Sequence, residues 1–444
     1  MDIQLYKHHL KETVKLAFPV AVGQLGHVMF GVVDSIMIGK VGADSLAAAS
    51  LVNGIFFLIL VLGIGMSLAI TPLIAIEKGR GREDKIGIIL RQGLLVNILF
   101  SLIIIAILFI ISENIDLLNQ PPEVAGKAGS YLKIITVSVI PFMLFQTYRQ
   151  FIEGLSYTKP PMYIVLAANL VNVFGNYLLI YGHWGLPALG LDGAGWSSLI
   201  TRIFMAAGLI IYVYRSKHFT SFDISMKFRN INTVVIKKLA SIGLPSGFQY
   251  FFEIGAFTIS AVMIGWIGSS SLAAHQIALN LASITYMIIL GVSTAGTIRV
   301  GNAYGRENKE EIKTAGNSAI IVAVALMAVF GIIFILFRNV LPYIYVSEAE
   351  VIETASKLLI IAALFQVFDG MQATGLGVLR GLTDAKIPMI LSIFVYWIVG
   401  IPLGYVLGFS AGYGVYGIWT ALSISLILAA IFFGVRFKIK VSKL

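Results

Sequence analysis

The sequence predicts an all-α integral membrane protein with twelve transmembrane helices in two parallel six-helix repeats. Three observations support this fold class. Hydrophobic residues make up 58% of the 444-residue chain, charged residues only 12%, and the mean hydropathy is +0.90. Long apolar stretches recur along the whole chain, and the first half matches the second at a nearly constant offset. Because a soluble chain carries about 25% charged residues, this sequence lacks the polar surface of a soluble fold.

Polar interruptions delimit the apolar stretches, each of which is long enough to cross a bilayer, since a crossing takes roughly 20 residues. An even number of spans places both termini on the same side of the membrane. The twelve predicted spans are 13–38, 46–75, 87–111, 130–151, 160–181, 193–214, 239–266, 273–298, 315–337, 351–374, 387–408 and 414–436.

The distribution of basic residues supports this topology. With cytoplasmic termini, 26 Lys and Arg side chains fall on the cytoplasmic side, five fall on the opposite side, and Arg202 lies inside a span. Such a bias is typical of proteins of the cytoplasmic (inner) membrane, whose cytoplasmic loops collect Lys and Arg. The net charge of +10 therefore predicts membrane orientation and not a nucleic-acid partner.

An internal repeat relates the two halves. Residues 37–48 match residues 263–274 at an offset of 226, with eight identities in twelve, and Pro19 falls on Pro245 in the same register. The repeat predicts an N-terminal six-helix lobe (1–214), a basic cytoplasmic linker (215–238) and a C-terminal six-helix lobe (239–444). Parallel repeats about an axis along the membrane normal are a transporter architecture, although a membrane scaffold or receptor could also arise by duplication.

Several chemistries are excluded by absent residues. The chain has no Cys, so disulfides, thiolate metal sites and thiol catalysis are impossible. It also lacks GxxxxGK[ST] and HExxH motifs. We therefore expect neither an enzyme nor a nucleotide-driven pump, and no cofactor.

Three acidic residues lie inside predicted spans: Asp34 in the first, Glu253 in the seventh and Asp369 in the tenth. A charge at the centre of a membrane helix costs about 2.5–3.5 kcal/mol on insertion scales, so such residues are functional candidates by default. In the 226-residue register Glu253 falls on His27 and Asp34 on Ser260. The charged positions are not shared by the halves, which favours a functional role over a buried structural one.

Amide side chains accompany one of these acids. Asn172 and Asn176 in the fifth span are one helical turn apart and present their carbonyls on one face. A carboxylate with amide oxygens is the hard-oxygen environment that a small cation prefers. Asn169 either supports this site or forms an interhelical hydrogen bond. The sequence thus predicts a site for a small cation at a buried carboxylate.

The remaining ionisable groups at membrane depth are less informative. We expect His275 to be a structural histidine, whereas His27 fits a structural and a functional role equally well. Arg202 has no carboxylate partner nearby in the sequence, so pairing with a distant acid and a structural role both stay open.

Four segments carry a resemblance to a known family. MIGKVGADSLAAAS and MIGWIGSSSLAAHQIA, together with EGLSYTKPPM and RGLTDAKIPM after spans four and ten, resemble the multidrug and toxic compound extrusion (MATE) transporters, and in particular their NorM-like branch. The resemblance implies a cation-coupling role for Glu253 and Asp369, and a second cation site at Asp34. It implies the coupling residues Glu253, Asp369, Asp34, Asn172 and Asn176, with Ser198, Ala194, Phe365, Tyr250 and Asn169 in support. It further implies Na+ at Glu253 and Asp369, or at Asp34, Asn172 and Asn176. Phe365 departs from the family, in which a Tyr hydroxyl can stand near the carboxylate of span ten.

The expected function is secondary antiport: small organic cations and drugs leave the cell in exchange for inward Na+ or H+, by alternating access. The expected partners are these substrates and membrane lipids, and the expected state is a monomer. One alternative is a flippase for lipid-linked oligosaccharides, which would need a cavity rich in Arg and Lys, but only Arg202 lies inside a span. The other alternative is a non-transporting scaffold or receptor.

Overall fold

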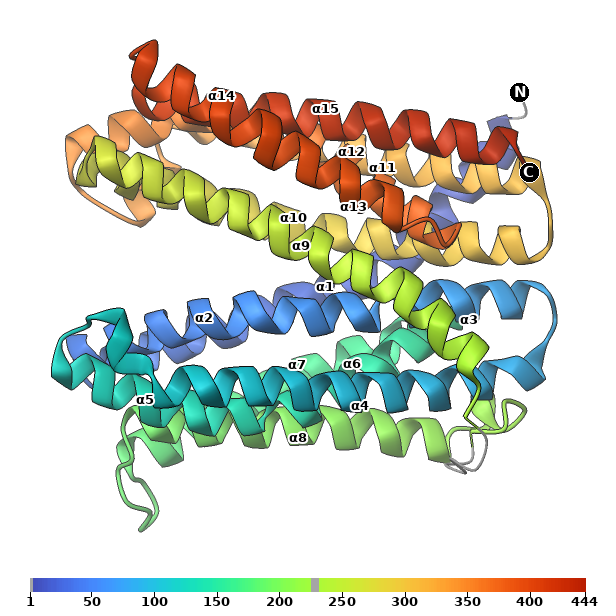
Figure 1. The fold of residues 1–444 in the computed structure, drawn as a ribbon, viewed down its shortest axis with the longest axis horizontal. Helices are drawn as coiled ribbons and strands as arrows, with labels where there is room; N and C mark the ends of the chain where they lie inside the picture. Colours follow the sequence, from blue (N-terminus) through green and yellow to red (C-terminus); the bar gives the residue numbers. More distant parts are fainter. Residues whose placement is uncertain (1–2, 225–230) are drawn as a thin grey trace. The chain divides into compact units, whose positions relative to one another are not determined.

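A computed structural model describes residues 3–224 and 231–444, which are helical and contain no β-strand. Figure 1 shows the order of the elements along the chain. The α-helices are α1 (Ile3–Gly39), α2 (Ala43–Ser67), α3 (Ile70–Gly79), α4 (Glu83–Glu113), α5 (Pro122–Val137), α6 (Val139–Gly154), α7 (Lys159–Tyr181), α8 (Leu191–Arg215), α9 (Thr233–Ile267), α10 (Ser269–Gly305), α11 (Lys309–Phe337), α12 (Ala349–Gly381), α13 (Lys386–Ile393), α14 (Ile401–Tyr405) and α15 (Gly414–Ser442).

The predicted number of spans is confirmed for the described residues. Eleven helical segments are long and apolar enough to cross a membrane, and α5 with α6, bent by 40°, supplies the twelfth. Most helices begin before the predicted span, and the largest differences are at α1, which starts at Ile3 instead of residue 13, and at the bent span, which starts at Pro122 instead of residue 130. In both cases the polar residues that precede the apolar run continue the helix beyond the hydrocarbon layer, where hydropathy cannot detect it.

Two further spans, besides the bent one, are not continuous α-helices. The predicted span 46–75 consists of α2 and α3, and the predicted span 387–408 contains two π-helical segments, Phe394–Gly400 and Val406–Ser410. Short π segments occur frequently at functional sites in membrane and soluble helices alike. The first of these segments contains Tyr396, which is buried.

The chain forms two compact units. Unit 1 comprises Met1–Ala21 and Phe248–Leu444, and unit 2 comprises Val22–Gly247. Each boundary follows a proline inside a long helix, Pro19 in α1 and Pro245 in α9. Proline removes a backbone hydrogen bond and bends a helix, so each of these helices contributes to both units. The predicted division by chain order stays a prediction, and residues 225–230 of the predicted linker lie outside the described residues.

Close glycine crossings reproduce the internal repeat inside each unit. In unit 2, a Cβ atom on Gly65 of α2 would overlap the backbone of Gly247 of α9. In unit 1, a Cβ atom on Gly291 of α10 would lie 2.6 Å from the carbonyl oxygen of Ala17 in α1. Gly65 and Gly291 are equivalent positions of the repeat. Small residues let membrane helices approach this closely, so the repeat conserves a backbone crossing.

Both described ends of the chain lie at the same end of unit 1 (Figure 1). Arg299 near the end of α10 donates to the carbonyl oxygen of His9 at 2.6 Å, and Lys309 at the start of α11 donates to the carbonyl oxygen of Ser442 at 2.9 Å. The α10–α11 turn therefore contacts the first and the last helix. This agrees with an even number of spans.

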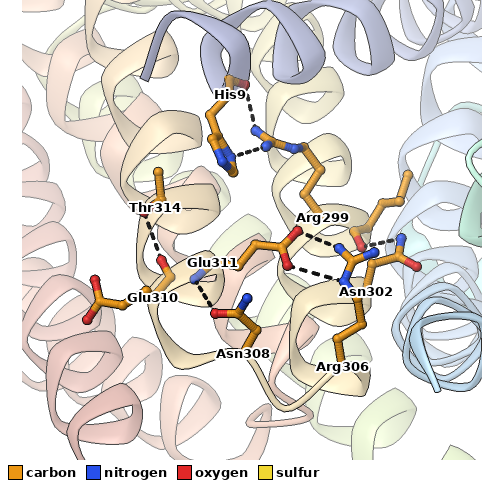
Figure 2. A network of polar contacts seen from close by, with 9 residues as sticks. His9, Arg299, Asn302, Arg306, Asn308, Glu310, Glu311 and Thr314 are labelled. Atoms are coloured by element: carbon orange, nitrogen blue, oxygen red, sulfur yellow. Dashed lines mark hydrogen bonds and ion pairs between the residues drawn. The ribbon is translucent and has the colours of Figure 1, made fainter. Parts of the chain in front are cut away.

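Figure 2 shows the polar network at this end of unit 1. Arg306 pairs with Glu311 at 2.5 Å, and the backbone N–H of Glu311 donates to the side chain of Asn308, which caps α11. Arg299 contacts His9 of α1 through a second hydrogen bond to the imidazole Nδ1. Arg306 pairs with Glu311 and Arg299 contacts His9, so the network joins the ends of α1, α10 and α11.

Candidate cation sites

The first candidate site, the Asp34 cluster, lies in unit 2 and consists of Asp34, Asn172, Asn176 and Ser198. The amide nitrogens of Asn172 and Asn176 donate to Oδ1 of Asp34 at 3.2 and 2.6 Å, and the Ser198 hydroxyl donates to Oδ2 at 3.3 Å. Asp34 is only 7% exposed. Three helices, α1, α7 and α8, therefore converge on one buried carboxylate.

The amide oxygens of this cluster have no partner. Oδ1 of Asn172 and Oδ1 of Asn176 are buried and accept no hydrogen bond among the described residues. The two ends of an amide differ only in the hydrogen-bond network that assigns them. Rotating either side-chain amide would turn its oxygen toward Asp34 in place of its NH2 group. The oxygen could then coordinate a cation beside the carboxylate. The cluster can thus hold a small cation with carboxylate, amide and hydroxyl oxygens, the ligands that Na+ accepts.

Two predicted supporting residues of this site lie differently. Asn169 donates to the backbone carbonyls of Gly26 at 3.1 Å and Val165 at 2.9 Å, so it joins α7 to α1 without touching the carboxylate. Ala194 is fully buried in α8, one turn before Ser198, and brings no side-chain ligand. Their supporting roles stay predictions.

The second candidate site, the Glu253 cluster, lies in unit 1 and consists of Glu253, Gln249, Gln372 and Asp369. Gln249 donates to Oε2 of Glu253 at 2.8 Å, and Gln372 donates to Oε1 at 3.3 Å. Glu253 is 6% exposed. The two glutamines were missed by the sequence analysis, because a glutamine in a span indicates an interhelical hydrogen bond and gives no sign of its partner.

Asp369 has fewer hydrogen-bond partners than Glu253, the other carboxylate of the cluster. It is 6% exposed and, within the described part of the chain, it accepts no hydrogen bond and forms no ion pair. It lies one turn before Gln372 on α12 and interacts electrostatically with Glu253. Two like charges close together in an apolar environment disfavour each other, so a proton or a bound cation would stabilise the pair.

Two tyrosines also interact with the carboxylates of this cluster. Tyr286 of α10 and Tyr396 of the π segment both interact electrostatically with Glu253 and Asp369. The Tyr396 hydroxyl is buried and makes no hydrogen bond of good geometry. Phe365, in contrast, packs its ring against Phe257 and Trp419. The hydroxyl that Phe365 lacks is thus available from Tyr396, which the sequence analysis did not single out.

Within the described residues, neither carboxylate of the Glu253 cluster forms an ion pair with a basic side chain. Arg380 interacts electrostatically with Glu253. It is buried, donates to the carbonyl of Leu376 at 3.3 Å and contacts the hydroxyl of Tyr250 at 3.4 Å. Its guanidinium centre lies 5.7 Å from the centre of the Tyr250 ring. Tyr250, predicted as a supporting residue of the cation site, therefore contacts the arginine.

The comparisons with known proteins show the family of this chain. Twelve spans in two repeats, each half with a buried acid, are typical of membrane transporters. A family model described as MatE matches residues 19–178 and 245–406. The chain belongs to this family, the MATE transporters, and to its NorM-like branch.

Two relatives and one solved structure illustrate the match. The chain is 36% identical over 433 residues to a probable multidrug resistance protein NorM of Mesorhizobium japonicum, covering 96% of this chain and 93% of the relative. It is 34% identical over 441 residues to the multidrug resistance protein MdtK of Yersinia pseudotuberculosis, covering 98% and 96%. The solved structure of the eukaryotic MATE transporter AtDTX14 aligns with a TM-score of 0.88 at 20% identity, covering 99% of this chain and 98% of that one.

Proposed function

We propose that this protein is a multidrug efflux antiporter that exports small organic cations in exchange for inward Na+ or H+. Alternating access of the central sites to the two sides of the membrane carries out the exchange. The relatives of similar length named NorM and MdtK are multidrug resistance proteins, which supports the substrate class.

One observation carries the proposal: the two buried acids of unit 1 form no ion pair. Glu253 and Asp369 lie inside spans, are almost fully buried and have no basic side chain within ion-pair distance among the described residues. An ionised carboxylate at such depth costs several kcal/mol unless a cation or proton accompanies it. The site is therefore favourable for a visiting positive charge, and two visitors that compete for it are mutually exclusive. Mutual exclusion at one site is the basis of antiport.

The membrane potential makes this coupling necessary. Each positive charge that enters gains about 2.3 kcal/mol per 100 mV of inside-negative potential, and each organic cation that leaves costs the same amount. Concentrative export of a cation therefore requires at least one coupled charge, and a chemical gradient of Na+ or H+ in addition.

The test is ethidium efflux in proteoliposomes with imposed Na+ and pH gradients. We expect gradient-driven efflux in the wild-type protein and its loss in Glu253→Gln and in Asp369→Asn. Glu353→Gln is the matched control, because Glu353 lies on α12 with Asp369 but is exposed and paired with Lys357 at 2.7 Å. Wild-type transport by both acid variants would refute the assignment, and absence of any gradient-driven efflux would favour the flippase or the scaffold.

We also propose that both termini face the cytoplasm in the inner membrane. The excess of basic residues on that side supports this orientation. The chain has no cysteine, so single cysteines report orientation directly. Lys443→Cys should react with a membrane-impermeant maleimide only after the membrane is opened, whereas Trp184→Cys, in the exposed turn after α7, should react in intact spheroplasts. The reverse pattern would invert the topology.

A further inference from the structure

Arg380 is a buried cation of unit 1 that forms no ion pair with an acid in the described part of the chain. It lies in the last turn of α12 and is only 6% exposed. Its Nε donates to the carbonyl oxygen of Leu376, one turn earlier, at 3.3 Å. The side chain thus follows the usual lean of helical side chains toward the N-terminus of their helix. This direction carries the guanidinium group toward Asp369 and Gln372, which precede Arg380 on α12.

Tyr250 connects Arg380 to the Glu253 cluster. Its hydroxyl lies 3.4 Å from Nη2 of Arg380, and its ring centre lies 5.7 Å from the central carbon of the guanidinium group. Tyr250 and Glu253 are three residues apart on α9, and residues at this spacing are neighbours on a helix surface, with Cβ atoms about 5–6 Å apart. Arg380 and Glu253 also interact electrostatically. One positive charge therefore lies near the carboxylates at which the coupled cation is proposed to bind.

The equivalent position of unit 2 contains the opposite charge. At the offset of 227 that aligns EGLSYTKPPM with RGLTDAKIPM, Arg380 falls on Glu153, and at the offset of 226 Tyr250 falls on Gln24. Glu153 is 1% exposed and pairs with Arg149 at 2.7 Å. Nη1 of Arg149 donates to Gln24 at 3.2 Å. Unit 2 thus has a neutral ion pair at this position, whereas unit 1 has a single unpaired positive charge.

We propose that Arg380 sets the cation affinity of the Glu253 cluster: its charge weakens cation binding at Glu253 and Asp369, so that the bound ion can leave. This inference rests on the proposed antiport. A transport site must bind its ion well enough to load and weakly enough to unload. Two ionised carboxylates and one guanidinium group leave a single net negative charge, so the cluster still attracts a cation, but less strongly than two carboxylates alone. Arg380 is a positioning residue that acts through Glu253.

A structural explanation is that Arg380 only stabilises the end of α12. A basic residue in the last turn of a helix is favourable, and its hydrogen bond to the carbonyl oxygen of Leu376 serves this purpose. Such a role predicts that removal of the arginine lowers the stability of the protein and leaves cation affinity unchanged or reduced. The proposed role predicts that removal raises cation affinity. The sign of the change therefore separates the two explanations.

The test is calorimetric titration of the full-length protein in lipid nanodiscs with NaCl and, separately, with ethidium, without an ion gradient. The Glu253→Gln variant identifies the cation that binds at the cluster, because its affinity for that cation falls. For this cation we expect Arg380→Gln to bind about fivefold or more tightly than the wild-type protein, and Arg380→Lys, which keeps the charge, to stay within about twofold of it. Arg306→Gln is the matched control and should change neither affinity, because Arg306 also follows a long helix of unit 1 but is exposed and paired with Glu311.

Transport rates supply a readout that a loss of stability does not reproduce. In proteoliposomes with imposed Na+ and pH gradients, we expect Arg380→Gln to reach half-maximal ethidium efflux at a lower concentration of the coupling ion. Its maximal rate should be lower than that of the wild-type protein, because tighter binding results mostly from slower dissociation. A variant that is merely less stable would lower the maximal rate and leave the half-maximal concentration unchanged.

Two results would overturn the role of Arg380: unchanged or weaker cation binding by Arg380→Gln, or equal tightening by Arg380→Lys, which would show that the charge is not the cause. If Arg380→Gln does not fold, Arg380→Met takes its place with the same expectation, because a long apolar side chain can keep the contact with Tyr250. If Glu253→Gln lowers the affinity for neither cation, the cluster is not a cation site, and the antiport assignment falls together with this inference. A loss in Glu253→Gln beside unchanged binding by Arg380→Gln refutes the role of Arg380 alone.

Discussion

The two units have equivalent helix arrangements but different buried ionisable residues. The Asp34 cluster contains one carboxylate with three hydrogen-bond donors, whereas the Glu253 cluster contains two carboxylates, of which Asp369 has no donor among the described residues. In the register of the repeat, Asp34 falls on Ser260, whose hydroxyl donates to its own helix backbone. Duplication thus kept the helices and their crossings, while the charged positions diverged.

This difference predicts a division of labour. A carboxylate with three donors is partly stabilised in its charged form, so it depends less on a visiting cation. The two carboxylates of the Glu253 cluster share only two amide donors. They depend strongly on a visiting cation, because burial disfavours the charged form. Unit 1 should therefore couple transport to the ion gradient, and unit 2 should modulate it.

The largest expected effect tests this division directly. Asp369→Asn removes a charge that only a visiting ion compensates, and the loss of one coupled charge is worth about 2.3 kcal/mol at 100 mV, or roughly 50-fold in the accumulation ratio of ethidium. Glu253→Gln should follow closely, and Asp34→Asn should lose less. The measurement is the steady-state gradient of ethidium in proteoliposomes at fixed potential. The division fails if Asp34→Asn abolishes accumulation while Asp369→Asn transports normally.

Next come the amides that support each acid. Asn176 donates to Asp34 at 2.6 Å and Gln249 donates to Glu253 at 2.8 Å. A hydrogen bond to a charged group contributes about 1.5–3 kcal/mol, so Asn176→Ala and Gln249→Ala should each weaken Na+ binding roughly tenfold. Asn169→Ala is the control, since Asn169 bonds only to backbone carbonyls. Calorimetric titration with NaCl measures the affinities, and an effect of Asn169→Ala as large as that of Asn176→Ala would contradict the defined cluster.

These residues also show which features of the fold and the sites can be predicted from the sequence. Hydropathy, charge bias and the repeat predicted the spans, because a segment that crosses a bilayer must be apolar along its length. The spacing of Asn172 and Asn176 fixed their common face, since helical pitch determines direction around one helix. Pitch alone does not fix how one helix turns toward another.

Partners on other helices therefore escaped prediction. Gln372 joins Glu253 only because α12 presents it toward α9, and Tyr396 approaches from a π segment whose extra residue no hydropathy profile detects. The same limit explains Arg202, whose ring partners Phe56 and Phe142 come from α2 and α6. These contacts are visible only in the structure, whereas the sequence identifies the ionisable residues inside spans whose partners had to be found.

The glycine crossings should behave alike in the two units, in contrast to the acids. A methyl group on Gly65 would overlap Gly247, and one on Gly291 would approach Ala17 and Ala21. Overpacking costs about 1–3 kcal/mol, so Gly65→Ala and Gly291→Ala should lower the free energy of unfolding by similar amounts. Gly54→Ala is the control, because nothing lies within 4 Å of a Cβ atom there. Unfolding in detergent measures the effect, and a loss in only one unit would show that the crossings are not equivalent.

The smallest effect concerns the third donor of Asp34. The Ser198 hydroxyl lies 3.3 Å from Oδ2, a longer contact than either amide makes to Oδ1 of the same carboxylate. Hydrogen bonds weaken with distance, so Ser198→Ala should reduce Na+ affinity about twofold, well below the loss in Asn176→Ala. Ser198→Thr keeps the hydroxyl and should bind Na+ like the wild-type protein. Ser197→Ala serves as the neighbouring control, since its hydroxyl donates to the backbone of Asn172 and not to Asp34. A larger loss in Ser198→Ala than in Asn176→Ala would mean that the hydroxyl, not the amides, is the principal ligand when the ion is bound, and that α8 moves toward Asp34 on binding.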